Sequence, residues 1–316
     1  MPNHKGNPNN YNLQTRDLTK AGHFCVKDQA RSGYIAYSSA RTYSERWDQF
    51  AFYAKSQGIK KLEHITPDVV KGYAQELASK IEKNQIQAST AQHYIGVINR
   101  VMHQATTGDW RSVRAVTDCG LPSRSRVRTQ PPDGMDKDKV KQAVNDIDKN
   151  LGSRAAQIPQ LQRELGLRAK EASLIDAHIA AKEANEKGKV LITEGTKNGR
   201  DRTVPITKQS QLDTLISAAN VQGPAKSMMD PDKSWKEWRE QDLRAINNEL
   251  KKHEIDRLHE LRAAYSCDRY YDLTSQNAPV ITGDIANQDK EARQIITEEM
   301  GHSSIDTTSS YLGGRS

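Results

Sequence analysis

The sequence predicts a mainly α-helical protein with one small β-sheet, divided into two domains. Three apolar stripes at helical spacing lie within residues 39–105, and helical spacing returns from Val140. Residues 189–206 differ, because two short β-branched runs flank a turn that contains Asn-Gly, a pattern typical of a β-hairpin. Between the two helical regions, residues 108–134 interrupt the periodicity with glycines and prolines, which indicates a linker.

Length and charge limit the function classes. A chain of 316 residues can form two domains that each bury a core, and its net charge of +7 favours an anionic partner. We find no apolar run long enough to span a bilayer and no signal-peptide segment, so we expect a soluble, cytoplasmic protein that does not bind a membrane. The three cysteines are widely spaced and lack a Cys-x-x-Cys pair, so we expect neither a disulfide framework nor a zinc site.

The first domain is predicted to be a small helical bundle. Tyr43, Trp47 and Phe50 recur at helical spacing, and Thr66-Pro67 supplies an N-cap followed by proline at the first helical position. A third apolar stripe follows residue 89. Taken in order, the chain is predicted to contain a flexible N-terminal arm at 1–30, a helical domain at 31–110, a basic interdomain linker at 111–134 and a second domain at 135–316.

The predicted linker carries an alternating set of arginines, Arg124, Arg126 and Arg128. On a basic two-domain protein, such a set could follow a nucleic-acid backbone. Simple solvation of the three side chains explains the same pattern about equally well. The N-terminal arm is open to the same two interpretations, a frayed terminus or a short DNA-contacting segment.

Three short motifs in the second domain contain candidate site residues. Arg168 precedes Glu171 by three residues after a Gly break, which by itself also describes an ordinary surface pair at a helix start. His259 and Arg262 share one helix face and could reach a common anion, although a solvated face is an equal explanation.

Gly301-His302 followed by Tyr311 is the most specific of the three motifs. If a serine after His302 caps a helix, Tyr311 lies about two turns along that helix and its hydroxyl could return toward His302. A terminal helix with a packing tyrosine is the simpler alternative, but it does not explain why the other pieces appear in this order.

Together, Arg168, a hairpin-turn Lys197, His259, Arg262, His302 and Tyr311 resemble the catalytic set of the tyrosine recombinase (phage integrase) family. The resemblance covers residues 31–316 and implies a helical core-binding domain followed by a mixed α/β catalytic domain. The strings Gly-Leu-Arg-x-x-Glu, His-x-Leu-Arg and Gly-His-Ser-Ser-x-x-Thr-Thr-x-x-Tyr-Leu carry it jointly. Lys197 is assigned by its place in the hairpin turn, with Lys187, Lys189 and Lys208 nearby.

The resemblance implies site-specific DNA cleavage and rejoining through a 3′-phosphotyrosine at Tyr311. Two guanidiniums can bind non-bridging phosphate oxygens with forked donors, which a lysine cannot do in a bidentate manner. The family assigns this binding to Arg168 and Arg262, protonation of the departing 5′ oxygen to Lys197, assistance in proton transfer to His259 and a hydrogen bond to a phosphate oxygen to His302. Glu171 resembles the family's acidic residue that orients the pocket; an exposed helix residue is the alternative.

The same resemblance implies double-stranded DNA as substrate, a homotetramer on paired sites, and an accessory directionality factor or DNA-bending protein. It requires no metal, no other cofactor and no ATP. Two rival functions remain open, a type IB topoisomerase-like strand-cleaving enzyme and a non-catalytic DNA-binding protein. The first predicts relaxation of supercoils without sequence preference, and the second predicts salt-dependent binding with no covalent product.

Overall fold

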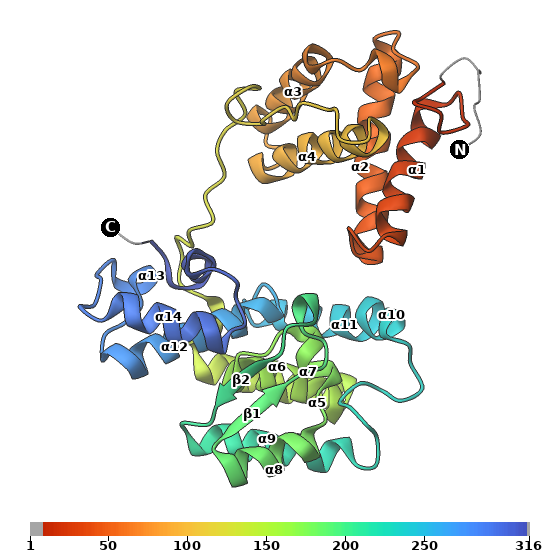
Figure 1. Ribbon diagram of the computed structural model, residues 1–316. Helices are drawn as coiled ribbons and strands as arrows, with labels where there is room; N and C mark the ends of the chain where they lie inside the picture. The colour runs from red at the N-terminus through yellow and green to blue at the C-terminus, as the bar shows by residue number, and fades with distance from the viewer. Residues whose placement is uncertain (1–8, 315–316) are drawn as a thin grey trace. The chain divides into compact units, whose positions relative to one another are not determined.

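The computed structural model describes residues 9–314. The chain divides into two compact units between Ser125 and Arg126, and each unit has its own hydrophobic core (Figure 1). Within the described residues, a single two-stranded sheet accompanies the helices. The predicted fold class, mainly α with a small β-sheet, is confirmed.

Unit 1 is a helical bundle around Trp47, which is fully buried and donates a hydrogen bond from Nε1 to the Leu18 carbonyl over 3.2 Å. Phe50 and Tyr73 pack edge to face beside it, with ring centroids 5.4 Å apart. Its helices are α1 (Leu18–Arg31), α2 (Tyr37–Ser56), α3 (Pro67–Glu82) and α4 (Ala88–Ala105).

The prediction of a flexible arm over residues 1–30 is wrong for the second half of this range, which forms α1. Asp17 caps this helix by accepting a hydrogen bond from the Lys20 amide, and the buried face of α1 includes Leu18 and Cys25. Because a glycine and several polar residues interrupt this stretch, its apolar stripe was not recognised in the sequence. Residues 1–8 of the predicted arm lie outside the described residues.

The first part of the predicted linker also belongs to unit 1. Val113 and Leu121 are buried in its core. Asn99 on α4 holds this segment, because its amide donates to the Val113 carbonyl over 2.8 Å and its side-chain oxygen accepts from the Val113 amide and from Nε1 of Trp110. The division between the units therefore falls later than the composition of residues 111–134 suggested.

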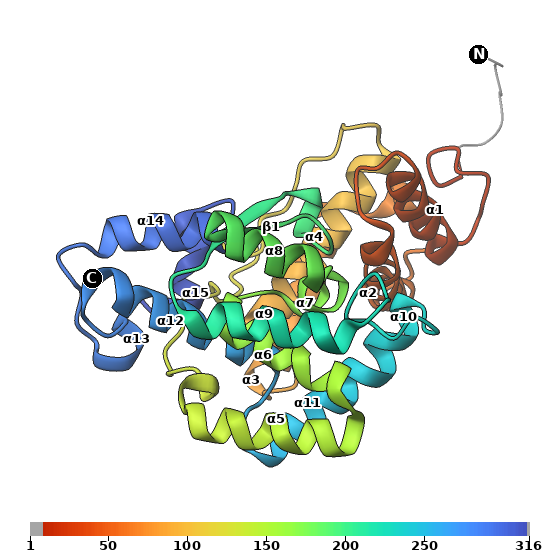
Figure 2. The same ribbon diagram turned by 90° about the horizontal axis from the view of Figure 1, so that it is seen from below.

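Unit 2 is built around two of its helices, α6 and α12, which pack against each other. Helices α8 and α9 lie side by side, as Figure 2 shows, and α14 and α15 pack against α12. The helices of unit 2 are α5 (Lys137–Leu151), α6 (Ser153–Leu165), α7 (Ala169–Leu174), α8 (Ala177–Lys187), α9 (Gln209–Gln222), α10 (Trp235–Glu237), α11 (Leu243–Lys252), α12 (Leu258–Thr274), α13 (Pro279–Thr282), α14 (Asp289–Glu299) and α15 (Ser309–Leu312).

The predicted hairpin is present in unit 2 as an antiparallel pair, β1 (Lys189–Ile192) and β2 (Arg202–Pro205). Val190 pairs with Val204, and both side chains are buried, so one face of the hairpin packs on the core. A 3-10 turn at Lys197–Gly199 lies in the loop between the strands. Lys197 therefore lies in the loop of the hairpin and not on either strand.

The long charged stretch near residues 220–256 contributes to the core of unit 2. Met228, Trp238 and Ile246 are buried there, and the Trp238 indole donates to Oγ of Ser173 over 2.9 Å. None of the helices formed by residues 9–314 combines the length and apolar character needed to cross a bilayer.

Gly166 ends α6 in a conformation that only glycine adopts easily, with φ of +60°. A Cβ at this position would lie 2.4 Å from Cδ1 of the Tyr265 ring. We expect Gly166→Ala to lower the free energy of unfolding by about 2–4 kcal/mol, since left-handed strain and overpacking add. Urea unfolding measures this change.

Gly188 is the matched control for this substitution. It ends α8 with φ of +62°, but a Cβ there would meet nothing within 4 Å. Gly188→Ala should therefore cost only about 1–2 kcal/mol, the strain alone. Equal losses in the two variants would show that the Tyr265 ring yields to the extra methyl group.

Candidate functional site

A buried carboxylate organises the site in unit 2. Glu171 on α7 is fully buried, and its oxygens lie 2.5 Å from Nη1 of Arg168, 2.7 Å from Nη2 of Arg202 and 3.7 Å from Nη1 of Arg262. Glu171 also accepts a hydrogen bond from the Arg168 backbone amide over 2.7 Å, as in a capping box at the start of α7. Burial opposes the charged form, but the Arg202 and Arg262 charges prevail and lower the pKa of Glu171 to about 2.

The same three guanidiniums bind backbone carbonyl groups at two helix ends. These carbonyls have no partner within their own helices, so they attract cations. Arg202 and Arg262 both donate to the Gly166 carbonyl at the end of α6. Near the end of α14, Arg168 donates to Met300 and Gly301, Arg202 to Glu299 and Arg262 to Met300.

Tyr311 lies among the aromatic and basic groups of the site. Its ring centroid is 5.2 Å from that of His259 and 5.1 Å from that of His302. The rings of His302 and Tyr311 are stacked. Cζ of Arg262 is 5.9 Å from the Tyr311 centroid. His259 and Arg262 come from adjacent turns of α12, as their spacing predicts.

His302 reaches Tyr311 because the chain turns sharply after α14. Gly301 takes φ of +62°, and the His302 amide then donates to the Thr297 carbonyl over 2.9 Å. The next segment is a 3-10 turn, η5 (Ile305–Thr308), which leads directly into α15. The Gly-His string is thus explained by a left-handed turn that only glycine adopts easily.

The two histidines are held neutral by their surroundings. Burial, followed by the charges of Arg262 and Arg168, lowers the pKa of His302 to about 3. Nδ1 of His302 is buried without a hydrogen-bond partner among the described residues. Loss of water around the ring, with the Arg262 charge, lowers the pKa of His259 to about 4, although His259 is an exposed residue and solvent screens part of this effect.

The charges of the site favour an anionic ligand. Three guanidiniums share the one buried carboxylate, and Arg262 is fully buried with Nε unpartnered among the described residues. Residues 9–314 contain no group of three or more acidic, histidine or cysteine side chains arranged to hold a metal ion. What this arrangement can do is bind a phosphate-like group next to a phenol.

Five of the six predicted catalytic residues, all except Lys197, therefore lie together with Glu171. Lys197 is exposed in the hairpin loop, and in the described part of the chain its ammonium group makes no hydrogen bond or ion pair. Two neighbouring lysines are engaged elsewhere: Lys187 pairs with Glu183, and Lys208 pairs with Asp272.

Sequence reasoning missed Arg202, which is 4% exposed and contacts both oxygens of Glu171. A signal was available, because Arg202 is two residues before the buried Val204 on the second strand of the predicted hairpin. Alternation along a strand places both side chains on the same, inward face. An inward-facing arginine requires a buried acceptor.

The three linker arginines have different surroundings. Arg128 forms an ion pair with the buried Glu260 and donates from Nε to the Gln130 carbonyl, a structural role that the sequence did not reveal. Arg124 lies 3.1 Å from Nε2 of His93, and Arg126 is exposed. Only Arg124 and Arg126 remain candidates for a phosphate contact.

A family model described as "Integrase" matches residues 126–268, and no curated protein sequence matches the chain. Solved structures of similar fold include a lambda integrase tetramer bound to a Holliday junction, with 14% identity, a TM-score of 0.60 and coverage of 96% of this chain and 79% of that one.

Two further structures of similar fold cover nearly the whole of both chains. A lambda integrase dimer bound to a COC′ core site has 16% identity, a TM-score of 0.60 and coverage of 94% of this chain and 96% of that one. The XerH recombinase bound to a palindromic difH substrate has 13% identity, a TM-score of 0.58 and coverage of 96% and 94%. Over residues 126–268 the chain matches the integrase family model, and over nearly its whole length it shares the fold of these recombinase structures.

Proposed function

We propose that this protein is a site-specific DNA recombinase that cleaves and rejoins DNA through a 3′-phosphotyrosine at Tyr311. The observation that carries the proposal is the position of the Tyr311 phenol between two histidines that are neutral at pH 7, beside a cluster of three guanidiniums. A packing tyrosine has no need of these neighbours. A nucleophile that attacks a phosphodiester needs both a proton acceptor and charge stabilisation.

In the proposed reaction, the Tyr311 oxygen attacks the phosphorus and the bond to the 5′ oxygen breaks. The phenol proton passes to the neutral His259, and the departing 5′ oxygen takes a proton from Lys197. Arg168 and Arg262 bind the non-bridging oxygens, and the neutral His302 donates its N–H to one of them. Reversal of these steps reseals the strand without ATP, because the phosphotyrosine conserves the energy of the broken bond.

Lys197 must approach the DNA for this reaction, and its position in an exposed loop allows that approach. Glu171 and Arg202 do not touch the phosphate. Instead they fix the directions of Arg168 and Arg262, since the carboxylate and the carbonyl groups occupy one side of each guanidinium. We assign these two residues a positioning role.

Double-stranded DNA is the proposed substrate and a homotetramer on two sites the proposed assembly. The support is that structures of the same fold hold DNA, in one case as a lambda integrase tetramer on a Holliday junction. An accessory directionality or bending protein remains a prediction from the family resemblance. A DNA-acting enzyme of this kind would act in the cytoplasm.

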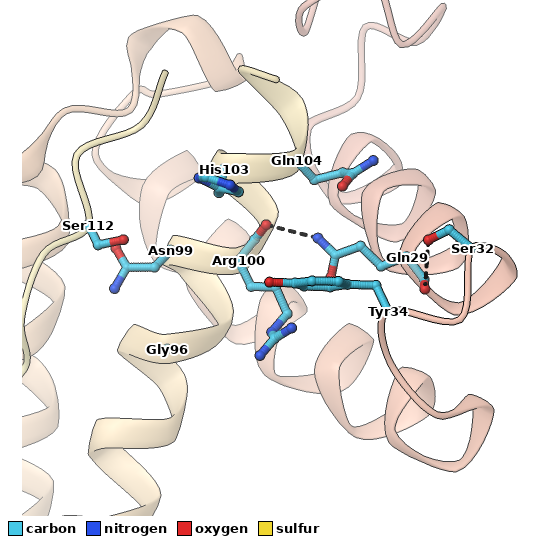
Figure 3. A pocket seen from close by; sticks show the side chains of 9 residues that line it. All are labelled: Gln29, Ser32, Tyr34, Gly96, Asn99, Arg100, His103, Gln104 and Ser112. Atoms are coloured by element: carbon cyan, nitrogen blue, oxygen red, sulfur yellow. Dashed lines mark hydrogen bonds between the residues drawn. The ribbon is translucent and has the colours of Figure 1, made fainter. Parts of the chain in front are cut away.

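Unit 1 offers a second place for DNA contact, a hollow of about 480 Å³ between α1 and α4 (Figure 3). Within residues 9–314, no carboxylate lines it. Cζ of Arg100 lies 5.3 Å from the Tyr34 ring centroid and 5.4 Å from that of Tyr43, so two aromatic rings fix the guanidinium. Among the described residues, no acidic side chain pairs with Arg100, which leaves its forked donors for a phosphate.

The first prediction from the proposed function tests the nucleophile. The wild-type protein, incubated with a library of nicked duplexes from DNA flanking its gene, should form a protein–DNA adduct that survives denaturation, and Tyr311→Phe should form none while still binding DNA. Tyr271→Phe is the matched control, because Tyr271 is 52% exposed on α12 and outside the site.

Sequencing the trapped DNA also separates the rival functions. A recurrent site supports recombination, whereas adducts spread without sequence preference would favour a topoisomerase-like enzyme. An adduct that persists in Tyr311→Phe would refute the assignment of the nucleophile. Tight binding without any adduct in the wild type would favour a binding-only protein.

The second prediction concerns pH. His302 has a folded pKa of about 3, below its usual value of about 6.5, so the unfolded chain binds more protons than the folded one between these values. The free energy of unfolding should therefore fall as pH falls below 6.5, by about 1 kcal/mol from this residue at pH 5.5. Urea unfolding at a series of pH values from 7.5 to 5 measures how steeply the free energy of unfolding changes with pH. His302→Gln should make this pH dependence shallower. An unchanged pH dependence in the variant would contradict the low pKa of His302.

The third prediction concerns unit 1. Arg100→Ala should weaken duplex binding by about tenfold, and the slope of log affinity against log salt should decrease by about one phosphate contact. Arg41→Ala is the control, because Arg41 already pairs with Glu45 over 2.8 Å. Equal effects of the two substitutions would show that the aromatic clamp has no special part in binding.

A further inference from the structure

Arg293 on α14 connects the segment that carries Tyr311 to the rest of unit 2. It is fully buried, and its Nε lies 2.7 Å and 2.9 Å from the two carboxylate oxygens of Asp289, one helical turn earlier. Its other nitrogens point to the C-terminal segment. Nη1 donates to Oγ of Ser309 over 3.4 Å and to the Gly313 carbonyl over 3.2 Å, and Nη2 donates to the Gly314 carbonyl over 3.1 Å.

These contacts bracket Tyr311 along the chain. Ser309 precedes it by two residues and Gly313 follows it by two, so one guanidinium fixes both ends of α15. One turn further along the same face of α14, Thr297 shares a 2.6 Å hydrogen bond with the fully buried Thr308. Two successive turns of α14 therefore hold the segment.

Asp289, the partner of Arg293, is also hydrogen-bonded to α12. Tyr270 on α12 donates its hydroxyl to Asp289 over 3.0 Å, and Asp289 in turn binds Arg293. Because α12 also carries His259 and Arg262, a continuous chain of buried hydrogen bonds joins the helix of the phosphate-binding arginine to the segment of the nucleophile. Such a network fixes distances between the groups at its two ends.

Gly313 allows the segment to lie close to α13. Its φ is +86°, and a Cβ at this position would be 2.8 Å from the backbone nitrogen of Val280 and 3.0 Å from the Val280 Cα. The backbone of residue 313 therefore cannot shift toward α13, and any side chain there would push it away.

We propose that Arg293 is the positioning residue for Tyr311. This inference rests on the proposed function, since it assigns Arg293 a part in that reaction. The guanidinium is fully buried, and its hydrogen bonds go to Asp289 and to the segment around Tyr311 rather than to the phenol. It sets the distance of the phenol from His259 and His302, and a displacement of about 1 Å in such a geometry can cost about 100-fold in rate.

The test uses Arg293→Lys in the full chain. Lysine keeps a cation beside Asp289, so the buried carboxylate stays paired, but one ammonium cannot also reach the carbonyls of Gly313 and Gly314. At saturating DNA, the rate of adduct formation on a nicked duplex of the trapped site should fall about 10- to 100-fold. Duplex affinity should change by less than about twofold, because no DNA-binding group is altered.

Arg154→Lys is the matched control. Arg154 on α6 also binds backbone carbonyls, those of Gln222 and Ser227, at 2.7 Å and 3.1 Å, but it holds a loop that does not carry a site residue. This variant should form adducts at the wild-type rate. An equal loss in both variants would mean that any arginine-to-lysine change of this kind disturbs unit 2, and it would overturn the proposal.

A measurement without DNA separates this inference from the proposed function. Hydrogen exchange of the amides in residues 309–314 should accelerate about tenfold or more in Arg293→Lys and stay unchanged in Arg154→Lys. If the wild type forms no adduct, the proposed function fails whatever the exchange shows. If the wild type forms adducts and Arg293→Lys does so at the same rate, only the positioning role fails.

A second variant reaches the same segment from the other side. Gly313→Ala leaves Arg293 intact and pushes the backbone away from Val280. It should lower the rate of adduct formation about 10-fold or more without loss of duplex binding, which keeps the proposal testable if Arg293→Lys does not fold. Wild-type cleavage by Gly313→Ala would overturn the proposal.

Discussion

The site depends on one buried carboxylate. Glu171 is the only acidic side chain that the three site guanidiniums contact in the described residues, and without it three like charges would lie together in the core. Removing one partner of such a buried cluster is costly, because the remaining charges lose their compensation. Its low pKa keeps the carboxylate charged at any physiological pH. The other features of the site follow from where Glu171 holds the arginines.

The arginines in turn fix the end of α14. Carbonyl groups at a helix C-terminus lack partners within the helix, and here guanidiniums from the N-cap residue of α7, from β2 and from α12 supply them. The turn at Gly301 is thereby fixed, and His302 projects from it toward Tyr311. Thus the position of a histidine at the end of one helix is set by a glutamate that lies 131 positions earlier in the sequence.

The sequence predicted those parts of the site that depend on local spacing. His259 and Arg262 share a helix face, and Gly301-His302 with Tyr311 forms a compact motif, so a family resemblance could identify them. Arg202 was missed because its partners, Glu171 and the carbonyls of two helix ends, are distant in the chain. No local pattern encodes a long-range ion pair, although strand alternation would have placed the side chain inward.

The same distinction explains the errors in domain organisation. The composition of residues 1–30 and 111–134 is polar and rich in turn formers, and local reasoning therefore read both as unstructured. Each nevertheless contributes a few apolar residues, such as Leu18 and Val113, to the core of unit 1. A short segment can be fixed by two or three buried side chains and one well-placed amide such as Asn99, which no measure of average composition detects.

The excess positive charge has a further consequence for the histidines. The arginine charges that attract a phosphate also disfavour protonation of His259 and His302, so both imidazoles are neutral when the site is empty. When a phosphodiester binds, its negative charge offsets part of this effect and raises the proton affinity of the rings. In the proposed reaction, a neutral His259 therefore becomes a better acceptor for the phenol proton once the substrate is bound. Substrate binding and proton acceptance are linked by the electrostatics of a single cluster.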